Sequence, residues 1–117
     1  MKTSPRTPSS KRLAEANPEA MEHYRRMRAV LLRHADVDAA LSEVVLTVQF
    51  AVLGEETAFK VHAQRALTLG ASKTQLRGVL MAGLGVTLVA SATARALAWL
   101  DEAYASAGTS SSTDSDT

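Results

Sequence analysis

The sequence contains no cysteine, and its 117 residues include only one tryptophan, two tyrosines and two phenylalanines. Without cysteine the chain has no disulfide framework, no zinc–thiolate site and no thiol nucleophile. The formal net charge is only +1, which gives no general attraction to nucleic acid or to acidic membranes. Thiol chemistry is therefore excluded, and we expect neither a nucleic-acid nor a membrane partner.

Targeting signals and long apolar runs are also scarce. Residues 1–12 are polar and basic and contain Pro5 and Pro8, and no apolar segment follows them as it would in a secretory signal. The most apolar stretch, residues 78–92, is too short to span a bilayer comfortably. The expected location is therefore the cytoplasm.

Alanine is what the chain has in abundance, with 21 residues. A chain rich in alanine and poor in aromatics favours closely packed helices over sheets. Residues 1–16 and 107–117 are rich in small polar side chains, and we expect both to be disordered tails because they bury little apolar surface. Residues 17–106 are predicted to form a single all-α domain.

About five helices are predicted in that domain. Asn17 followed by Pro18 is typical of a helix start, and Gly54 is typical of a helix end. Ser72 and Gln75 have the spacing of a capping box at the start of the fourth helix. The expected helices are 17–33, 41–53, 55–69, a fourth from 72 to a break at 83–85, and 86–104.

Two of these helices are too apolar for a small domain. The helix at 41–53 and the glycine-punctuated helix that begins at 72 are apolar on almost all sides. They indicate more buried surface than one subunit provides, so we expect a homo-oligomer. A row of small residues in the last helix, Ala90, Ala94 and Ala98, would let another helix approach closely, although a general bias toward alanine explains it equally well.

One pair of residues is a candidate for chemistry. His62 lies in the third predicted helix among apolar neighbours, and Glu43 is the only charge in the second. Antiparallel packing about Gly54 would bring the two to similar heights. A carboxylate beside an imidazole fixes the tautomer of the ring and favours its protonated form, which suits general acid–base catalysis near neutral pH. The alternatives are an ordinary boundary histidine and a glutamate that interacts with the helix dipole.

Several spacings around this pair agree with a known family. The family pattern has a glutamate in one helix, a glycine at the end of that helix and a histidine in the next helix. An alanine follows four residues after the histidine, and a Gly-Ala-Ser turn follows eight residues after it. Over roughly residues 20–104 the chain resembles the carboxymuconolactone decarboxylase and alkylhydroperoxidase D superfamily. The matching positions are Glu43, Gly54, His62, Ala66 and Gly70–Ser72.

The chain also departs from part of that superfamily. The peroxidase branch carries a Cys-x-x-Cys pair ahead of its histidine, where this chain has Glu55 and Ala58. Without a thiolate there is no attack on peroxide and no disulfide relay. The resemblance is therefore closer to the decarboxylase branch, whose acidic and aromatic residues ahead of the histidine are similar in kind to Glu55, Glu56 and Phe59.

The resemblance implies a cofactor-free acid–base enzyme, without a metal, that acts on a small activated acid or lactone. The reaction would be a decarboxylation or a related isomerisation or cyclisation, and the assembly a trimer or hexamer. His62 would be the general acid or base, and Glu43 would orient it or relay the proton. The expected substrate contacts are Glu55, Glu56, Phe59 and Arg65; the alternatives are helix capping for the glutamates, core packing for Phe59 and a solvated side chain for Arg65.

Two other functions fit parts of the same sequence. Residues 66–76 have the spacing of a helix-turn-helix, which would present Lys73, Gln75 and Arg77 to DNA. The low net charge and the apolar continuation of that helix count against this interpretation. The second alternative is a non-catalytic member of the same fold with a binding or assembly role.

Overall fold

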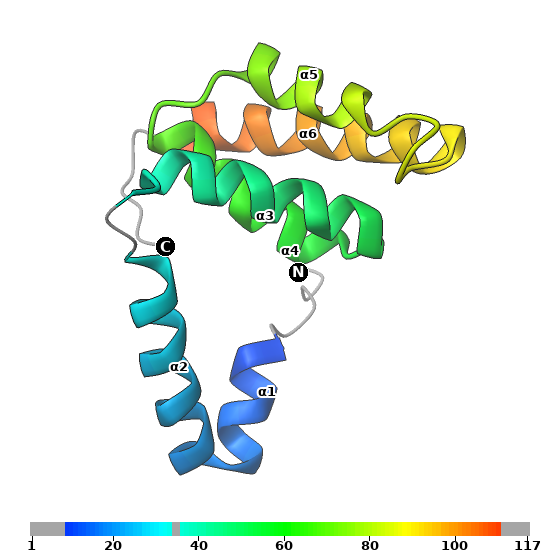
Figure 1. The fold of residues 1–117 in the computed structure, drawn as a ribbon. Helices are drawn as coiled ribbons and strands as arrows, with labels where there is room; N and C mark the ends of the chain where they lie inside the picture. Colours follow the sequence, from blue (N-terminus) through cyan, green and yellow to red (C-terminus); the bar gives the residue numbers. More distant parts are fainter. Residues whose placement is uncertain (1–8, 34–35, 111–117) are drawn as a thin grey trace. The chain divides into compact units, whose positions relative to one another are not determined.

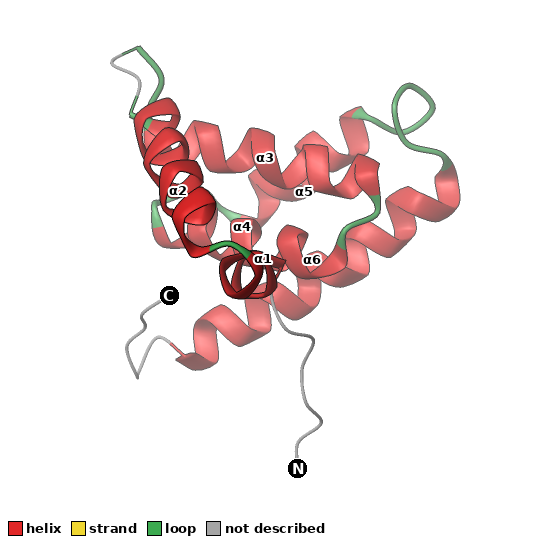
Figure 2. Cartoon of the chain, turned by 90° about the horizontal axis from the view of Figure 1, so that it is seen from below, coloured by secondary structure: helices red, strands yellow, loops and turns green. Residues whose placement is uncertain are grey.

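The computed structural model describes residues 9–33 and 36–110, and their regular structure is entirely helical (Figures 1 and 2). The all-α prediction is therefore confirmed. None of the described helices is long and apolar enough to cross a membrane. The helices are α1 (Ser9–Ala16), α2 (Pro18–Leu32), α3 (Ala39–Leu53), α4 (Glu56–Thr68), α5 (Lys73–Ala82) and α6 (Ala90–Ser110).

The chain divides between Asp36 and Val37 into two compact units, where the sequence indicated one domain. The N-terminal unit contains α1 and α2. As expected, α2 begins at Asn17, whose side chain accepts a hydrogen bond of 2.9 Å from the amide of Ala20. Helix α1 occupies Ser9–Ala16, a segment expected to be a disordered tail, because lysine, arginine, leucine, alanine and glutamate are all strong helix formers. The rest of that expected tail, residues 1–8, lies outside the described residues.

The C-terminal unit contains α3 to α6, and α4 packs against both α3 and α6. Helix α3 begins two residues earlier than predicted, because the Asp38 carboxylate accepts a hydrogen bond of 2.8 Å from the amide of Leu41. At its other end Gly54 has a φ of 75°, the left-handed conformation that ends a helix. Helices α3 and α4 therefore run antiparallel about this turn, as the sequence predicted.

Helix α5 packs mainly on α6, and a compact loop joins them (Figure 1). Ser72 and Gln75 form the predicted capping box at the start of α5. Helix α6 begins at Ala90 rather than at residue 86, because the carbonyl of Gly83 accepts hydrogen bonds from the amides of residues 86, 87 and 88 and holds them in a turn. Helix α6 also continues to Ser110, into the segment expected to be a C-terminal tail; residues 111–117 lie outside the described part of the chain.

Alanine is the most frequent residue in the core of the C-terminal unit. Five of the eleven buried residues in its apolar cluster are alanines, contributed by α3, α4 and α6. The Phe59 and Trp99 rings, 5.6 Å apart between centroids, provide the aromatic part of this core. The cluster consists of Ala51, Phe59, Ala63, Ala66, Leu76, Leu80, Leu88, Ala96, Trp99, Leu100 and Ala103.

The turn between α3 and α4 gives a first test of the fold. A Cβ at position 54 would meet nothing closer than the Arg95 guanidinium at 3.9 Å, so the cost of Gly54→Ala is backbone strain rather than a clash. We expect Gly54→Ala to lower the free energy of unfolding by about 1–2 kcal/mol, and Gly54→Asn to lower it less, because asparagine tolerates a positive φ. Urea unfolding of the three proteins measures this order, and equal stability would contradict the left-handed turn.

Candidate functional site

Glu43 and His62 meet between α3 and α4. The Nδ1 atom of His62 lies 2.6 Å from Oε1 of Glu43. Both side chains are largely buried, with 9% of Glu43 and 16% of His62 exposed to solvent. The antiparallel pairing of the two helices about Gly54 makes this contact, because the residues lie eleven positions before and eight positions after the turn.

Two further α3 residues contact Glu43 or His62, and neither was predicted from the sequence. The ring of Phe50 stacks on the imidazole of His62, with centroids 5.2 Å apart and planes inclined by 23°. The hydroxyl of Thr47 is buried and donates a hydrogen bond of 2.7 Å to the carbonyl oxygen of Glu43. Positions 43, 47 and 50 share one face of a helix, so the helical spacing from Glu43 was the signal that could have identified them.

The contact with Glu43 fixes the protonation geometry of the His62 ring. An ionised carboxylate only accepts hydrogen bonds, so Nδ1 carries the hydrogen when Glu43 is ionised. Every buried side-chain nitrogen or oxygen of the described residues has a hydrogen-bond partner. Among the described residues the ring bonds only through Nδ1, so Nε2 is not completely buried. Nε2 is thus the ring nitrogen that makes no contact with Glu43.

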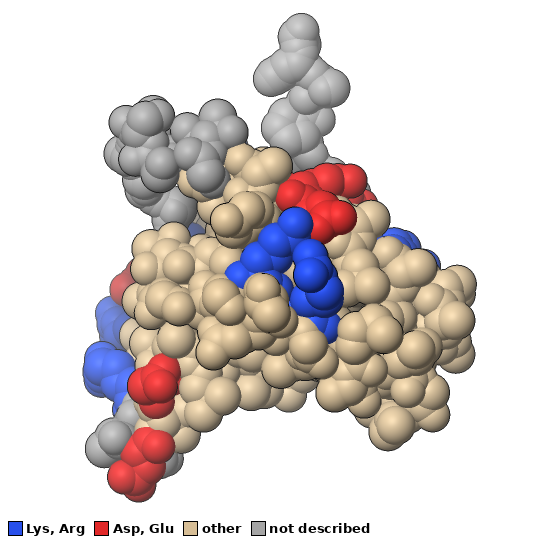
Figure 3. Space-filling model, turned by 90° about the horizontal axis from the view of Figure 1, so that it is seen from above, with Lys and Arg blue, Asp and Glu red and all other residues tan. Residues whose placement is uncertain are grey.

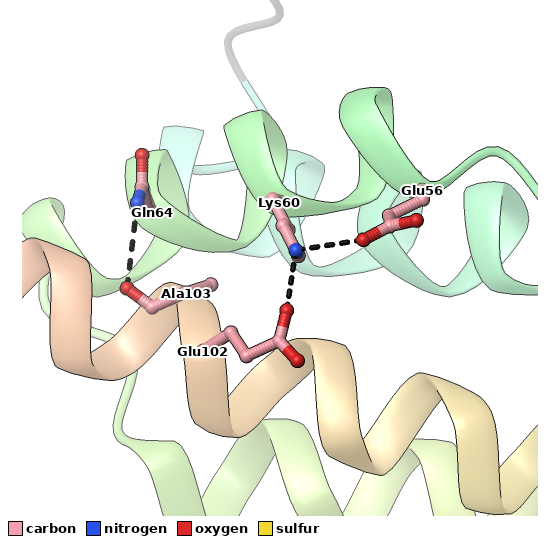
Figure 4. Close-up of polar contacts among 5 residues, drawn as sticks. All are labelled: Glu56, Lys60, Gln64, Glu102 and Ala103. Atoms are coloured by element: carbon pink, nitrogen blue, oxygen red, sulfur yellow. Dashed lines mark hydrogen bonds and ion pairs between the residues drawn. The ribbon is translucent and has the colours of Figure 1, made fainter. Parts of the chain in front are cut away.

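The two glutamates predicted to contact substrate lie at the start of α4. Glu55 occupies the N-cap position and is exposed, but its side chain makes no capping hydrogen bond. Glu56 pairs with Lys60 at 2.8 Å, and Lys60 also reaches Glu102 of α6 at 2.5 Å (Figure 4). The hydrogen bond to Glu102, and then the one to Glu56, raise the pKa of Lys60 above its usual value. Glu56 therefore belongs to a bridge between α4 and α6.

The other two predicted substrate contacts are also separate from the pair. Phe59 is completely buried and packs against Trp99, so it has the core position that was its alternative and lines no open site. Arg65 lies on the exposed surface of α4. Of the six predicted site residues, the structure therefore brings together only Glu43 and His62.

An open apolar groove of about 820 Å³ lies beside the α4–α5 turn. Its walls include Leu41 and Val44 of α3, Leu69 at the end of α4 and Val79 of α5, with Asp38 at one end of α3. His62 and Glu43 are not among the residues that line it. This groove and the candidate acid–base pair are thus separate features of the C-terminal unit.

The residues that would contact DNA in a helix-turn-helix are partly engaged within the chain. Lys73 pairs with Asp101 of α6 at 2.9 Å and lies 5.1 Å from the centre of the Tyr104 ring. The hydrogen bond from Lys73 lowers the pKa of Asp101. The side chain of Gln75 accepts the Ser72 amide hydrogen bond of the capping box at 2.8 Å. Two of the three expected DNA contacts therefore have structural partners.

No family model matches this chain, and no curated protein or solved structure is significantly similar to it. Across residues 9–33 and 36–110, there is no group of three or more His, Cys, Asp or Glu side chains placed to hold a metal ion. The site is therefore described by its own residues: a buried carboxylate, an imidazole that bonds to it through Nδ1 and an aromatic ring stacked on that imidazole.

The Lys60 bridge gives a pH-dependent prediction. A lysine whose pKa is raised by folding stabilises the fold at every pH below its unfolded pKa of about 10.4, and this contribution is lost as the pH rises through the higher folded pKa. We expect Lys60→Met to lower the free energy of unfolding by about 0.5–1 kcal/mol near pH 7. The difference from the parent should shrink above about pH 10.4.

Urea unfolding from pH 6 to pH 11 measures this difference. Lys11→Met is the matched control, because Lys11 is exposed on α1 of the other unit. A constant difference between Lys60→Met and the parent across this range would show that the bridge to Glu56 and Glu102 does not contribute through its charge.

Proposed function

We propose that this chain is an acid–base enzyme that needs no cofactor and transfers a proton to or from carbon in a small activated carboxylic acid or lactone. The observation that carries the proposal is the 2.6 Å contact between His62 Nδ1 and Glu43 Oε1, made by two largely buried side chains. The substrate class comes from the family resemblance of the residues around this pair.

The proposed step follows from the protonation geometry of the pair. In a decarboxylation the bond between the carboxylate and the α-carbon breaks, carbon dioxide leaves, and the electron pair remains on the substrate as an enolate. A protonated His62 delivers its Nε2 hydrogen to that carbon and becomes neutral, while Glu43 keeps the hydrogen on Nδ1. In an isomerisation the neutral ring first removes a proton from carbon through Nε2 and then returns one elsewhere.

The surroundings of the ring support this role. Burial strengthens the interaction between the carboxylate and a protonated imidazole, because little water screens it. Phe50 stacks on one face of the ring and so limits its rotation. A general acid held in one orientation contributes to rate because no reorganisation is needed when the proton moves.

A binding or assembly role without catalysis is the second candidate. The large number of exposed apolar side chains on the C-terminal unit favours it, among them Leu53, Val86 and Val89, each about two-thirds exposed or more. Such surfaces mark sites of association with other molecules. This candidate requires no proton transfer at His62, so the two functions make different predictions.

Replacement of His62 tests the enzymatic proposal. The assay incubates the full chain in D2O with a panel of β-keto acids and carboxylated γ-lactones and follows both carbon dioxide release and deuterium incorporation at carbon by NMR. We expect the parent to turn over at least one compound, and His62→Gln to lower the rate at least roughly 100-fold, because general acid–base catalysis contributes about 10²–10⁴. Glutamine keeps a donor for Glu43, so the fold is retained.

His23→Gln is the matched control, since His23 is an exposed histidine of α2 in the N-terminal unit. It should leave the rate unchanged. Full activity of His62→Gln, or a parent that neither releases carbon dioxide nor incorporates deuterium with any compound of the panel, would overturn the proposal and favour the binding role.

A further inference from the structure

One end of the C-terminal unit carries no charge. The seventeen residues from Gly78 to Ala94 contain no Asp, Glu, Lys or Arg and are flanked by Arg77 and Arg95. Fourteen of the seventeen are exposed or half-buried. In the space-filling view the end of the unit that holds the α5–α6 loop, at the right, is largely tan (Figure 3). The large apolar side chains exposed there are Val79, Met81, Leu84, Val86 and Val89.

The loop that presents Leu84, Val86 and Val89 is held by backbone hydrogen bonds. Besides the three amides bound by the carbonyl of Gly83, the amide of Gly85 donates a hydrogen bond of 2.9 Å to the carbonyl of Leu88. The side chain of Leu88 is anchored in the core with 3% exposed. Val86 and Val89 are nevertheless 81% and 68% exposed. An apolar surface on an ordered loop loses little conformational entropy when it is covered, which favours association.

We infer that this uncharged end, residues 78–94, is the surface through which two copies of the chain associate about a two-fold axis. A two-fold interface places the same patch of both copies face to face, so any charge near the axis meets its own like charge. A surface without charges avoids that repulsion. Aliphatic interfaces that resemble a core cut in half are typical of stable homodimers.

The composition of the uncharged end disfavours other occupants. Helices that lie on anionic membranes carry lysine and arginine beside their apolar face, and residues 78–94 contain neither. Binding hot spots for other proteins are enriched in tryptophan, tyrosine and arginine, which are also missing from this stretch. A second copy of the same aliphatic surface is a partner that requires neither the basic residues of a membrane-binding helix nor the aromatic residues of a hot spot.

The size of the surface is consistent with a dimer. A standard interface uses about 20–30 residues from each partner, and the fourteen accessible residues of the uncharged end supply its central part. Two of these fourteen, Ala90 and Ala94, are exposed on the first turns of α6. Small side chains there let the partner approach the helix backbone closely, which compensates for the modest number of large side chains.

Self-association of the full chain measures the inference directly. We expect sedimentation of the parent to show a dimer, or an assembly of an even number of copies, at micromolar concentration. The double variant Val86→Lys with Val89→Lys should raise the dissociation constant at least 100-fold, because it places like charges across the axis. Both residues are exposed, so the helical circular dichroism should not change. Val52→Lys on α3, where the valine is 46% exposed, is the matched control and should shift the constant less than tenfold.

The lack of cysteine permits a second measurement on the same surface. Single variants Val79→Cys, Val86→Cys and Val89→Cys each contain one thiol, so any disulfide dimer must join the same position in two copies. In a two-fold interface at least one of them should cross-link at least tenfold faster than Val52→Cys under mild oxidation. This reports the symmetry, which sedimentation alone does not.

Three results would overturn the inference. The first is a parent that stays monomeric at 100 µM. The second is an assembly that keeps its size in the double lysine variant, or one that contains an odd number of copies. The third is a monomer that binds vesicles of phosphatidylcholine and phosphatidylserine through this end, so that the double lysine variant no longer binds them.

Discussion

The close packing of α4 between α3 and α6 is the constraint on which the rest of the C-terminal unit depends. It is possible because Ala63 and Ala66 of α4 are completely buried and belong to the same apolar cluster as Ala51 of α3 and Ala96 of α6. Larger side chains at these positions would push the helices apart. The distance between Glu43 and His62 is set by the same packing, so the alanine core determines both the fold and the geometry of the candidate site.

Rules that act over a few residues predicted much of this structure. Asn17, Ser72 and Gly54 each mark a helix boundary as expected. The contact between Glu43 and His62 was also predictable, because it requires only a count of residues on either side of one turn. Contacts between residues far apart in the sequence could not be predicted in this way. The bridge from Lys60 to Glu102 spans 42 positions. It depends on how α4 and α6 are aligned, and tertiary packing decides that alignment.

The difference between local and long-range contacts also explains why some predicted site residues lie away from Glu43 and His62. Phe59 and His62 are three positions apart on α4, yet Phe59 faces the core shared with α6 while His62 faces α3. A sequence shows which residues share a helix but not which neighbour each face meets. The late start of α6 has a similar origin, since the carbonyl of Gly83 binds three consecutive amides and keeps them from beginning a helix.

The candidate acid–base pair and the uncharged end lie on different helices of the same unit. Glu43 and His62 belong to α3 and α4, whereas residues 78–94 comprise part of α5, the loop and the start of α6. Burial of that end in a dimer would therefore stabilise α5 and α6 directly, without using any residue of the pair. Because α4 packs on α6, such stabilisation would also hold α4 in place against α3. Association at one end of the unit would thus help to preserve the contact between His62 and Glu43 at another.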